Sequence, residues 1–299
     1  MQHFGSLCVY RVVLTKKSVT MKIKVFTIIA STVLLIFCGC KKDDSKVRYH
    51  NPFTEPYNPG VKVSHIRQST LYLGVECLGQ LSSYDLRWNW ANERVESMDW
   101  WSDMLNTPDP IHTTLQYNNQ GQLASACDNS NNGLHFEYRD GRLATISYIR
   151  NNYSIAFHQF LYEGKDKYPS ILIDGIYDDF HPSTDTLFLE WEDGNLMNVT
   201  SKGDAIWPEG EFTFTYDNNP NPLCGMPLCQ PYCDAPEYFF SLFCRNNLTS
   251  IHFRNSETYS NTRHLQYEYT DDLPTQIVRT GATTAFWCDI IDTIKIEYK

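Results

Sequence analysis

One short pattern recurs along this sequence and constrains its fold more than any other feature. An aromatic residue ends one segment, four turn residues follow, and an aliphatic residue opens the next. Close copies run from Trp90 to Val95, Tyr138 to Leu143, Trp191 to Leu196 and Phe243 to Leu248. Looser copies start at Tyr117, Tyr162, Tyr216 and Tyr269 and end, where an aliphatic partner is evident, at Leu123, Leu223 and Leu273. Apolar and polar residues alternate between these turns, so the pattern predicts an array of β-hairpins.

The clearest copy lies within residues 134–148, where Asp140 and Gly141 occupy the turn. A type I′ turn needs a positive φ at both central residues, and Asp-Gly tolerates this best. The predicted cross-strand pairs are Tyr138 with Leu143 and Phe136 with Thr145. One face of this hairpin is then apolar, and the other carries His135, Glu137, Arg139 and Arg142.

The aromatic residues that end the units follow one another at intervals of 21 to 29 residues, which indicates a repeat. They are Trp90, Tyr117, Tyr138, Tyr162, Trp191, Tyr216, Phe243 and Tyr269. Residues 293–298 read as one more first strand that closes the array. Chance recurrence in a tyrosine-rich all-β chain remains the alternative.

A meander of about seventeen strands is wider than open sheets usually are, so it should curl or close on itself. We therefore predict an all-β fold, a large antiparallel meander of hairpins forming a strongly curled or barrel-like sheet. A membrane-spanning barrel is disfavoured, because the strands carry charges on both faces. Only residues 93–105 could form a short helix.

The N-terminal region predicts export and lipidation. Residues 21–40 combine a basic start, an apolar run and a small residue before Cys40, which resembles a bacterial lipoprotein signal with Cys40 as the acylated residue. A membrane-spanning anchor is the alternative. Residues 1–20 read as an upstream mis-start. The residues after Cys40 include Lys42, Asp43 and Asp44, which resemble the signal that sends Bacteroidota lipoproteins to the outer face of the outer membrane.

The proline-containing residues 41–60 read as a stiff tether, and residues 61–299 as a single β-sheet domain. The units over residues 70–299 resemble YD repeats. Residues 214–223 are similar to a motif in Bacteroidota lipoproteins of a domain family of unknown function with a porin-like β fold. The resemblance implies a lipid anchor in the outer membrane, facing the cell surface or the periplasm, and no assigned activity.

A cysteine cluster follows in a proline-rich stretch, formed by Cys224, Cys229, Cys233 and Cys244. An exported location favours disulfides there, while unpaired thiols and a metal site stay open as alternatives. Seven cysteines lie beyond the leader region, and an odd count leaves at least one thiol free or paired between molecules.

Two further sets of residues could bind a ligand. Four acids in one loop region, Asp174, Asp178, Asp179 and Asp185, are weak calcium candidates, because carboxylates suit a hard cation but the spacing is not that of an EF-hand. Trp100 and Trp101 are candidates for stacking on sugar rings, and adjacent strand residues face opposite ways, so one of them should point outward.

The formal net charge of −10 argues against a nucleic-acid partner, which would demand clustered lysine and arginine. No catalytic motif is present, and neither a cofactor nor an enzymatic activity is predicted. The sequence favours a surface-exposed, lipid-anchored β-sheet module that binds glycan or protein. Alternatives are a structural or assembly lipoprotein that partners an outer-membrane protein complex, and a glycan hydrolase.

Overall fold

The structure is a computed structural model, and it describes residues 47–58, 60–73, 81–103, 109–177, 183–203, 207–226, 236–255, 259–282 and 289–299. Ser45–Lys299 forms one compact unit. The predicted leader at residues 21–40 and the residues before it lie outside the described part of the chain.

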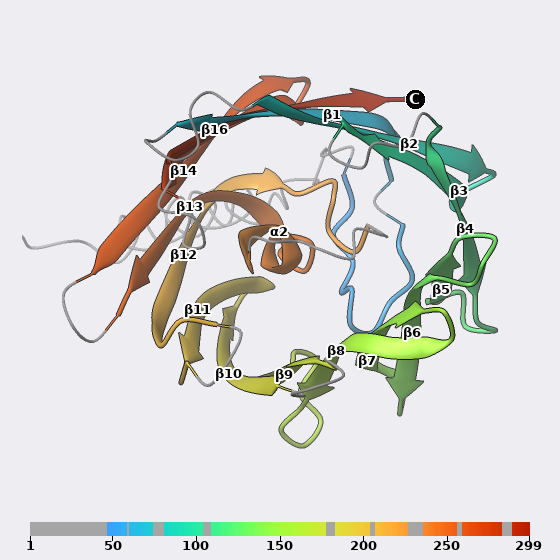
Figure 1. Cartoon of the computed structure of the whole chain (residues 1–299), viewed down its shortest axis with the longest axis horizontal. Helices are drawn as coiled ribbons and strands as arrows, with labels where there is room; N and C mark the ends of the chain where they lie inside the picture. The colour runs from blue at the N-terminus through green and yellow to red at the C-terminus, as the bar shows by residue number, and fades with distance from the viewer. Residues whose placement is uncertain are drawn as a thin grey trace, which may run out of the picture. The chain divides into compact units, whose positions relative to one another are not determined.

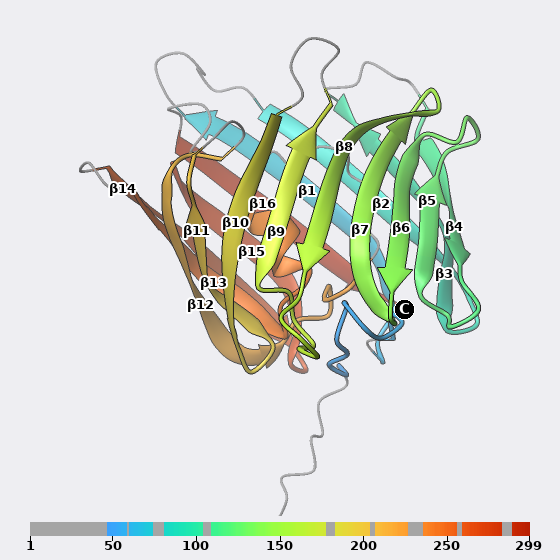
Figure 2. The same cartoon turned by 90° about the horizontal axis from the view of Figure 1, so that it is seen from below.

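In the described residues, sixteen antiparallel strands form a closed barrel (Figures 1 and 2). The strands are β1 Val63–Leu73, β2 Leu81–Ala91, β3 Arg94–Ser102, β4 Ile111–Tyr117, β5 Leu123–Cys127, β6 Gly133–Arg139, β7 Arg142–Arg150, β8 Tyr153–Leu161, β9 Ile171–Ile176, β10 Ser183–Glu192, β11 Asn195–Ser201, β12 Gly210–Pro220, β13 Asn246–Arg254, β14 Ser260–Thr270, β15 Leu273–Ala282 and β16 Asp289–Tyr298. Each strand pairs with the next along the chain, and β16 also pairs with β1. The predicted all-β meander is confirmed, and its last strand closes the ring.

The hairpin between β6 and β7 has the predicted turn and a register that differs from the prediction. Asp140 and Gly141 have φ values of 53° and 75°, as a type I′ turn requires. Tyr138 pairs with Leu143, but Phe136 pairs with Ile146 instead of Thr145. A β-bulge between Glu137 and Tyr138 inserts one residue into β7, so every pair beyond the bulge shifts by one.

The same bulge accompanies the other regular hairpins of the repeat. In each case the register shifts immediately before the aromatic residue. Trp90, Tyr117, Trp191 and Tyr216 pair with the first aliphatic residue of the partner strand, and Tyr269 pairs with Pro274. These shifts occur at Asn89/Trp90, Gln116/Tyr117, Glu190/Trp191, Thr215/Tyr216 and Glu268/Tyr269. Bulges bend and twist a strand, so their regular placement at one end of the hairpins contributes curvature to the barrel.

Aromatic side chains at this end also link each repeat unit to an earlier one. Seven of them donate a hydrogen bond of 2.5 to 2.8 Å to a backbone carbonyl. The pairs are Trp90 to Val63, Tyr117 to Val95, Tyr162 to Leu143, Trp191 to Pro169, Tyr216 to Leu196, Tyr267 to Leu248 and Tyr298 to Pro274. The sequence repeat therefore corresponds to a repeated structural contact. The ring of the aromatic residue packs inward, and its polar atom donates a hydrogen bond to the preceding unit.

Two predicted hairpins of the repeat do not form. Tyr216 pairs with Leu248 in β13, whereas Leu223 lies in a turn and Phe243 lies outside any strand. The residues between β12 and β13 form an insertion that includes the short helix α2, Pro236–Ser241. The Pro and Cys content of this insertion breaks the alternation that strands require, and Phe243 packs into the core instead of ending a strand.

The short helix considered for residues 93–105 is also absent from the described part of that segment. Arg94–Ser102 is the strand β3, paired with both β2 and β4. Its inward positions Val95 and Met98 are fully buried, and the bulge at the hairpin accounts for their spacing of three. The bulge therefore gives this strand a spacing of three between buried residues, a spacing that is also typical of a helix.

Residues 47–58, expected to belong to a tether, instead pack inside the ring of strands, as the blue segment in Figure 1 shows. Phe53 is 1% exposed, and its ring contacts those of Phe160, Trp191 and Phe243. The amide of Leu143 donates to the Phe53 carbonyl at 2.7 Å. Burying an aromatic side chain of this size stabilises the fold by about 1.5–3 kcal/mol, so this segment is part of the core.

The barrel interior is mainly apolar, and its outer face is largely polar. Along β10, Leu187 and Leu189 are buried in the core, while Glu190 and Thr184 are exposed. The outward positions of other strands carry further exposed polar residues, among them Arg87, His112, Thr213, His252, His264, Gln266, Glu268, Lys295 and Glu297. This pattern differs from the continuous apolar band of a lipid-facing barrel. Among the described helices, none has the length and apolar character needed to cross a membrane.

Candidate functional site

A groove of about 480 Å³ lies on the outer face of β1, β2 and β3. Its lining includes Arg67 and Ser69 from β1, Ser83, Asp85 and Arg87 from β2, Asp99 and Trp101 from β3, and Pro110. Side chains two residues apart on a strand share one face, which places Arg67 beside Asp85 and Asp85 beside Trp101 in the cross-strand register. The groove thus combines a flat aromatic wall with charged and hydroxyl side chains.

Trp100 and Trp101 take opposite sides of β3. Trp100 packs against the buried apolar cluster that contains Val63 and Leu86, and it pairs with Leu86 in the register. Trp101 is half-buried and lines the groove. Of the two residues singled out as possible sugar-stacking groups, Trp101 alone lines the outer groove, while Trp100 belongs to the core.

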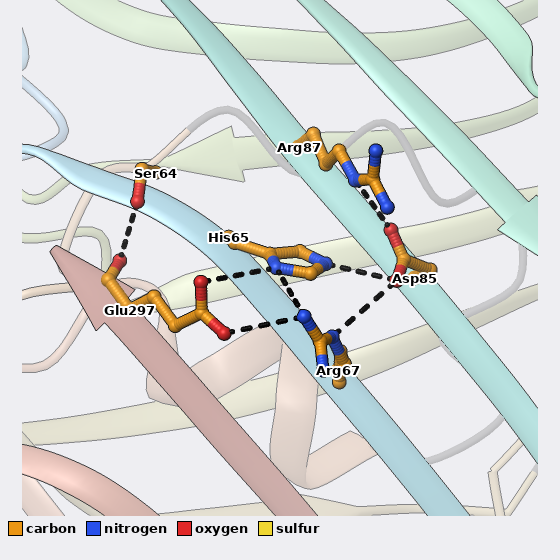
Figure 3. A network of polar contacts seen from close by, with 6 residues as sticks. All are labelled: Ser64, His65, Arg67, Asp85, Arg87 and Glu297. Atoms are coloured by element: carbon orange, nitrogen blue, oxygen red, sulfur yellow. Dashed lines mark hydrogen bonds and ion pairs between the residues drawn. The ribbon is translucent and has the colours of Figure 1, made fainter. Parts of the chain in front are cut away.

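His65 is the buried centre of a polar network that joins three strands (Figure 3). Its side chain is 8% exposed, its Nε2 lies 2.9 Å from Asp85 Oδ2, and its Nδ1 lies 3.4 Å from Glu297 Oε2. Glu297 of β16 is directly opposite His65, and Arg87 of β2 is opposite on the other side. His65 therefore lies between the carboxylates of two neighbouring strands.

Both arginines of the network are held by Asp85. Arg87 Nε lies 3.0 Å from Asp85 Oδ1, and Arg67 Nε lies 3.7 Å from Asp85 Oδ2. Arg67 also reaches Glu297, with Nη2 3.3 Å from Oε1. Because both arginine side chains are more than half exposed, these ion pairs contribute little to stability. Their main effect is to orient the guanidinium groups over the groove.

The other carboxylate of the groove, Asp99, is engaged in the same way. His112 Nδ1 lies 2.6 Å from Asp99 Oδ1, and Asn89 Nδ2 donates to Asp99 Oδ2 at 3.1 Å. Asp99 pairs with His112 in the register of β3 and β4. Both aspartates of the groove thus have partners on neighbouring strands.

Of the calcium candidates, Asp174 and Asp185 lie opposite each other on β9 and β10 and face the barrel interior. The Trp207 indole N–H donates to Asp174 Oδ2 at 2.6 Å, and the Trp207 amide donates to Asp185. His158 Nδ1 lies 3.1 Å from Asp174 Oδ1. These carboxylates therefore bind Trp207, which lies in the segment before β12, and they are not part of a solvated loop.

Asp178 and Asp179 lie outside the described residues. Within the part of the chain that is described, no group of three or more His, Cys, Asp or Glu residues could hold a metal ion.

Cys224 and Cys244 are buried free thiols in the insertion between β12 and β13. Burial raises the pKa of the Cys244 thiol to about 11, and burial together with Cys244 raises the pKa of the Cys224 thiol. The predicted disulfide cluster is therefore not formed by these two residues. Cys229 and Cys233 lie outside the described residues, as do the lipidation candidate Cys40 and the export-signal residues Lys42, Asp43 and Asp44.

The interior also holds a buried charge pair that the sequence did not predict. Arg279 and Asp292 face each other across β15 and β16, are 4% and 0% exposed, and form an ion pair. Burial and the charge of Arg279 lower the pKa of the nearby Arg263 to about 10. Breaking such a pair by removing one partner is strongly destabilising, so these residues constrain the interior of the barrel.

The His65 network was missed because its members come from distant segments. The only sequence signal is the spacing of two in His65 and Arg67 and again in Asp85 and Arg87, which places each pair on one strand face. Recognising the site also requires the pairing of β1 with β16, which no local pattern encodes.

Neither a protein-family model nor a curated protein matches this sequence. Among solved structures, the chain is similar to a porin-like protein from Bacteroides vulgatus ATCC 8482, with 14% identity and a TM-score of 0.41 over 77% of this chain and 97% of that one. It is also similar to TcdB2-TccC3 without its hypervariable C-terminal region, with 13% identity and a TM-score of 0.24 over 75% of this chain and 14% of that one. Both identities are below 25%, so these likenesses concern the fold alone.

Proposed function

We propose that this protein is a non-enzymatic binding module, anchored by lipid in the outer membrane, that holds a glycan in the groove on β1, β2 and β3. The observation that carries the proposal is the position of Trp101, whose side chain lines a groove of about 480 Å³ together with arginine, aspartate and serine side chains. A flat aromatic ring can cover the apolar face of a sugar, while polar neighbours bind its hydroxyl groups.

The proposed location rests on the predicted lipidation of Cys40 and on the export-signal residues that follow it. Two or more acyl chains give stable membrane attachment, so the barrel would work while tethered. Its polar outer face suits a domain that is held at a membrane and is not inserted into it.

A second candidate is an assembly role in an outer-membrane complex, and one surface feature favours it. Tyr177 is 51% exposed, and the ring of Phe157 lies 5.2 Å from that of Tyr177. An exposed aromatic pair of this kind can mark a protein contact. Co-purification of a membrane barrel protein, lost in Tyr177→Ala, would support the assembly role.

Hydrolysis has less support. A glycosidase needs two carboxylates available to the substrate, whereas Asp85 and Asp99 already contact groups on neighbouring strands.

Glycan binding can be tested with the unit Ser45–Lys299 on a glycan array and in pull-down assays with purified polysaccharides. We expect binding that Trp101→Ala weakens at least about tenfold, equivalent to about 1.4 kcal/mol. Tyr153→Ala, which removes a more exposed aromatic residue away from the groove, is the matched control and should bind as the wild type does. Absence of binding on both assays would contradict the proposal.

A further inference from the structure

The groove presents hydrogen-bond donors to a ligand, while its carboxylate acceptors already have partners. Asp85 Oδ1 lies 3.0 Å from Arg87 Nε, and its Oδ2 lies 2.9 Å from His65 Nε2. The two oxygens of Asp99 are bound by His112 and Asn89 at 2.6 and 3.1 Å. A ligand that needs acceptors therefore has to compete with groups that are already in place.

Arg87 is the main source of available donors. Its side chain is 64% exposed, and among the described residues its guanidinium contacts Asp85 through Nε alone. Because Asp85 holds Nε, the two terminal nitrogens with their N–H groups are left for a ligand. The hydrogen bond from Arg87 Nε to Asp85, which itself lies against the buried His65, orients the guanidinium before a ligand arrives.

A planar guanidinium with two available nitrogens matches a carboxylate, which accepts two parallel hydrogen bonds. A neutral sugar hydroxyl both donates and accepts, so it fits a donor-rich groove less well. We infer that the ligand of this groove is a glycan that bears carboxylates, bound by Arg87 beside Trp101; this inference rests on the glycan-binding function proposed above.

The overall acidity of the chain does not oppose this assignment at close range. The charges of Arg67, Arg87, Asp85 and Asp99 cancel formally within the groove lining. More distant exposed charges are screened beyond about 8 Å at physiological ionic strength. The short, charge-assisted contacts of Arg87 therefore decide the preference.

The test is a panel of uronic-acid oligosaccharides, each paired with its carboxyl-reduced neutral form, titrated against the unit Ser45–Lys299 by calorimetry. We expect at least one acidic form to bind at least about tenfold more tightly than its reduced partner. Arg87→Gln should remove that preference, and Arg87→Lys should restore only part of it, because lysine keeps the charge but lacks the planar pair of donors.

Arg254→Gln is the matched control, since Arg254 is an exposed strand arginine (68%) paired with Glu211 far from the groove in the strand order. Equal binding of acidic and neutral forms, with Trp101 still required, would overturn the carboxylate assignment and leave the glycan-binding function standing. Binding of no member of the panel, acidic or neutral, would count against both. An acidic preference that survives Arg87→Gln would overturn the role of Arg87.

Discussion

The ring of Phe53 stacks on the ring of Phe243 with a centroid separation of 4.9 Å and an angle of 13° between the ring planes. Phe53 precedes the first strand, and Phe243 lies in the insertion before β13. The two segments that occupy the barrel interior therefore meet each other as well as the strands, and the core depends on both.

Truncation of Phe53 should reveal this dependence. Phe53→Ala removes a 1% exposed ring and leaves a cavity, so we expect a loss of about 3–5 kcal/mol in the free energy of unfolding, measured by urea denaturation. Phe188→Ala, at 37% exposure on the outer face, is the control and should cost far less. A cost for Phe53→Ala similar to that of the control would mean that residues 47–58 are not part of the core.

His50 should make the stability of the fold depend on pH. Burial lowers the pKa of His50 to about 4 from its ordinary value of 6.5, and the carboxylate of Glu55 offsets part of this effect. The unfolded chain therefore binds the proton more readily than the folded protein does. Above pH 6.5 His50 is neutral in both states and leaves the free energy of unfolding unchanged. As the pH falls from 6.5 towards 4, His50 lowers the free energy of unfolding by up to about 3 kcal/mol.

The measurement is the free energy of unfolding at a series of pH values for the wild type and for His50→Gln. The variant should show a shallower loss of stability between pH 6.5 and 4 than the wild type. Parallel curves for the two proteins would show that His50 does not titrate in this way.

The contact between Trp207 and the buried carboxylates gives another prediction. Asp174→Asn turns one acceptor into an amide that can face the indole N–H with a donor, so we expect a loss of about 1–3 kcal/mol and a change in tryptophan fluorescence. Glu190→Gln removes an exposed charge from the outer face of β10 and should change neither quantity. An unchanged free energy of unfolding in Asp174→Asn would show that the hydrogen bond to Trp207 is not needed.

Gly175 is predicted to be required because an aromatic ring occupies its side-chain position. A Cβ atom there would lie 2.2 Å from Phe157 Cε1, so Gly175→Ala should destabilise the fold by about 1–3 kcal/mol. A double-mutant cycle identifies the cause: Gly175→Ala should cost much less in a Phe157→Ala background. Equal costs in both backgrounds would point to a source other than this clash.

The features that could be predicted from sequence are those set by local chemistry. The Asp140-Gly141 turn and the pairing of Tyr138 with Leu143 follow from backbone preferences and alternation within a few residues. The bulge one residue further along was not predicted, because its extra residue, Ala144, has no distinctive chemistry. The register of the strands beyond each turn therefore needed the structure.

The packing of Phe53 and the His65 network could not be predicted, because both depend on contacts between distant segments. Residues 47–58 contain prolines and polar residues, and contacts with distant parts of the chain, such as the rings around Phe53, make this segment part of the core. For Trp101 the sequence predicted that one residue of a pair points outward, but the strand register was needed to choose it.

The closure of the barrel also limits how a partner can be recognised. Every described strand has a neighbour on both sides, including β1 and β16. No strand edge of the described sheet is therefore left with a row of unpaired amides and carbonyls, and a partner cannot bind by adding a strand. Recognition then depends on the side chains of the outer face, which substitutions such as those at Trp101 and Arg87 can alter without disturbing the backbone ring.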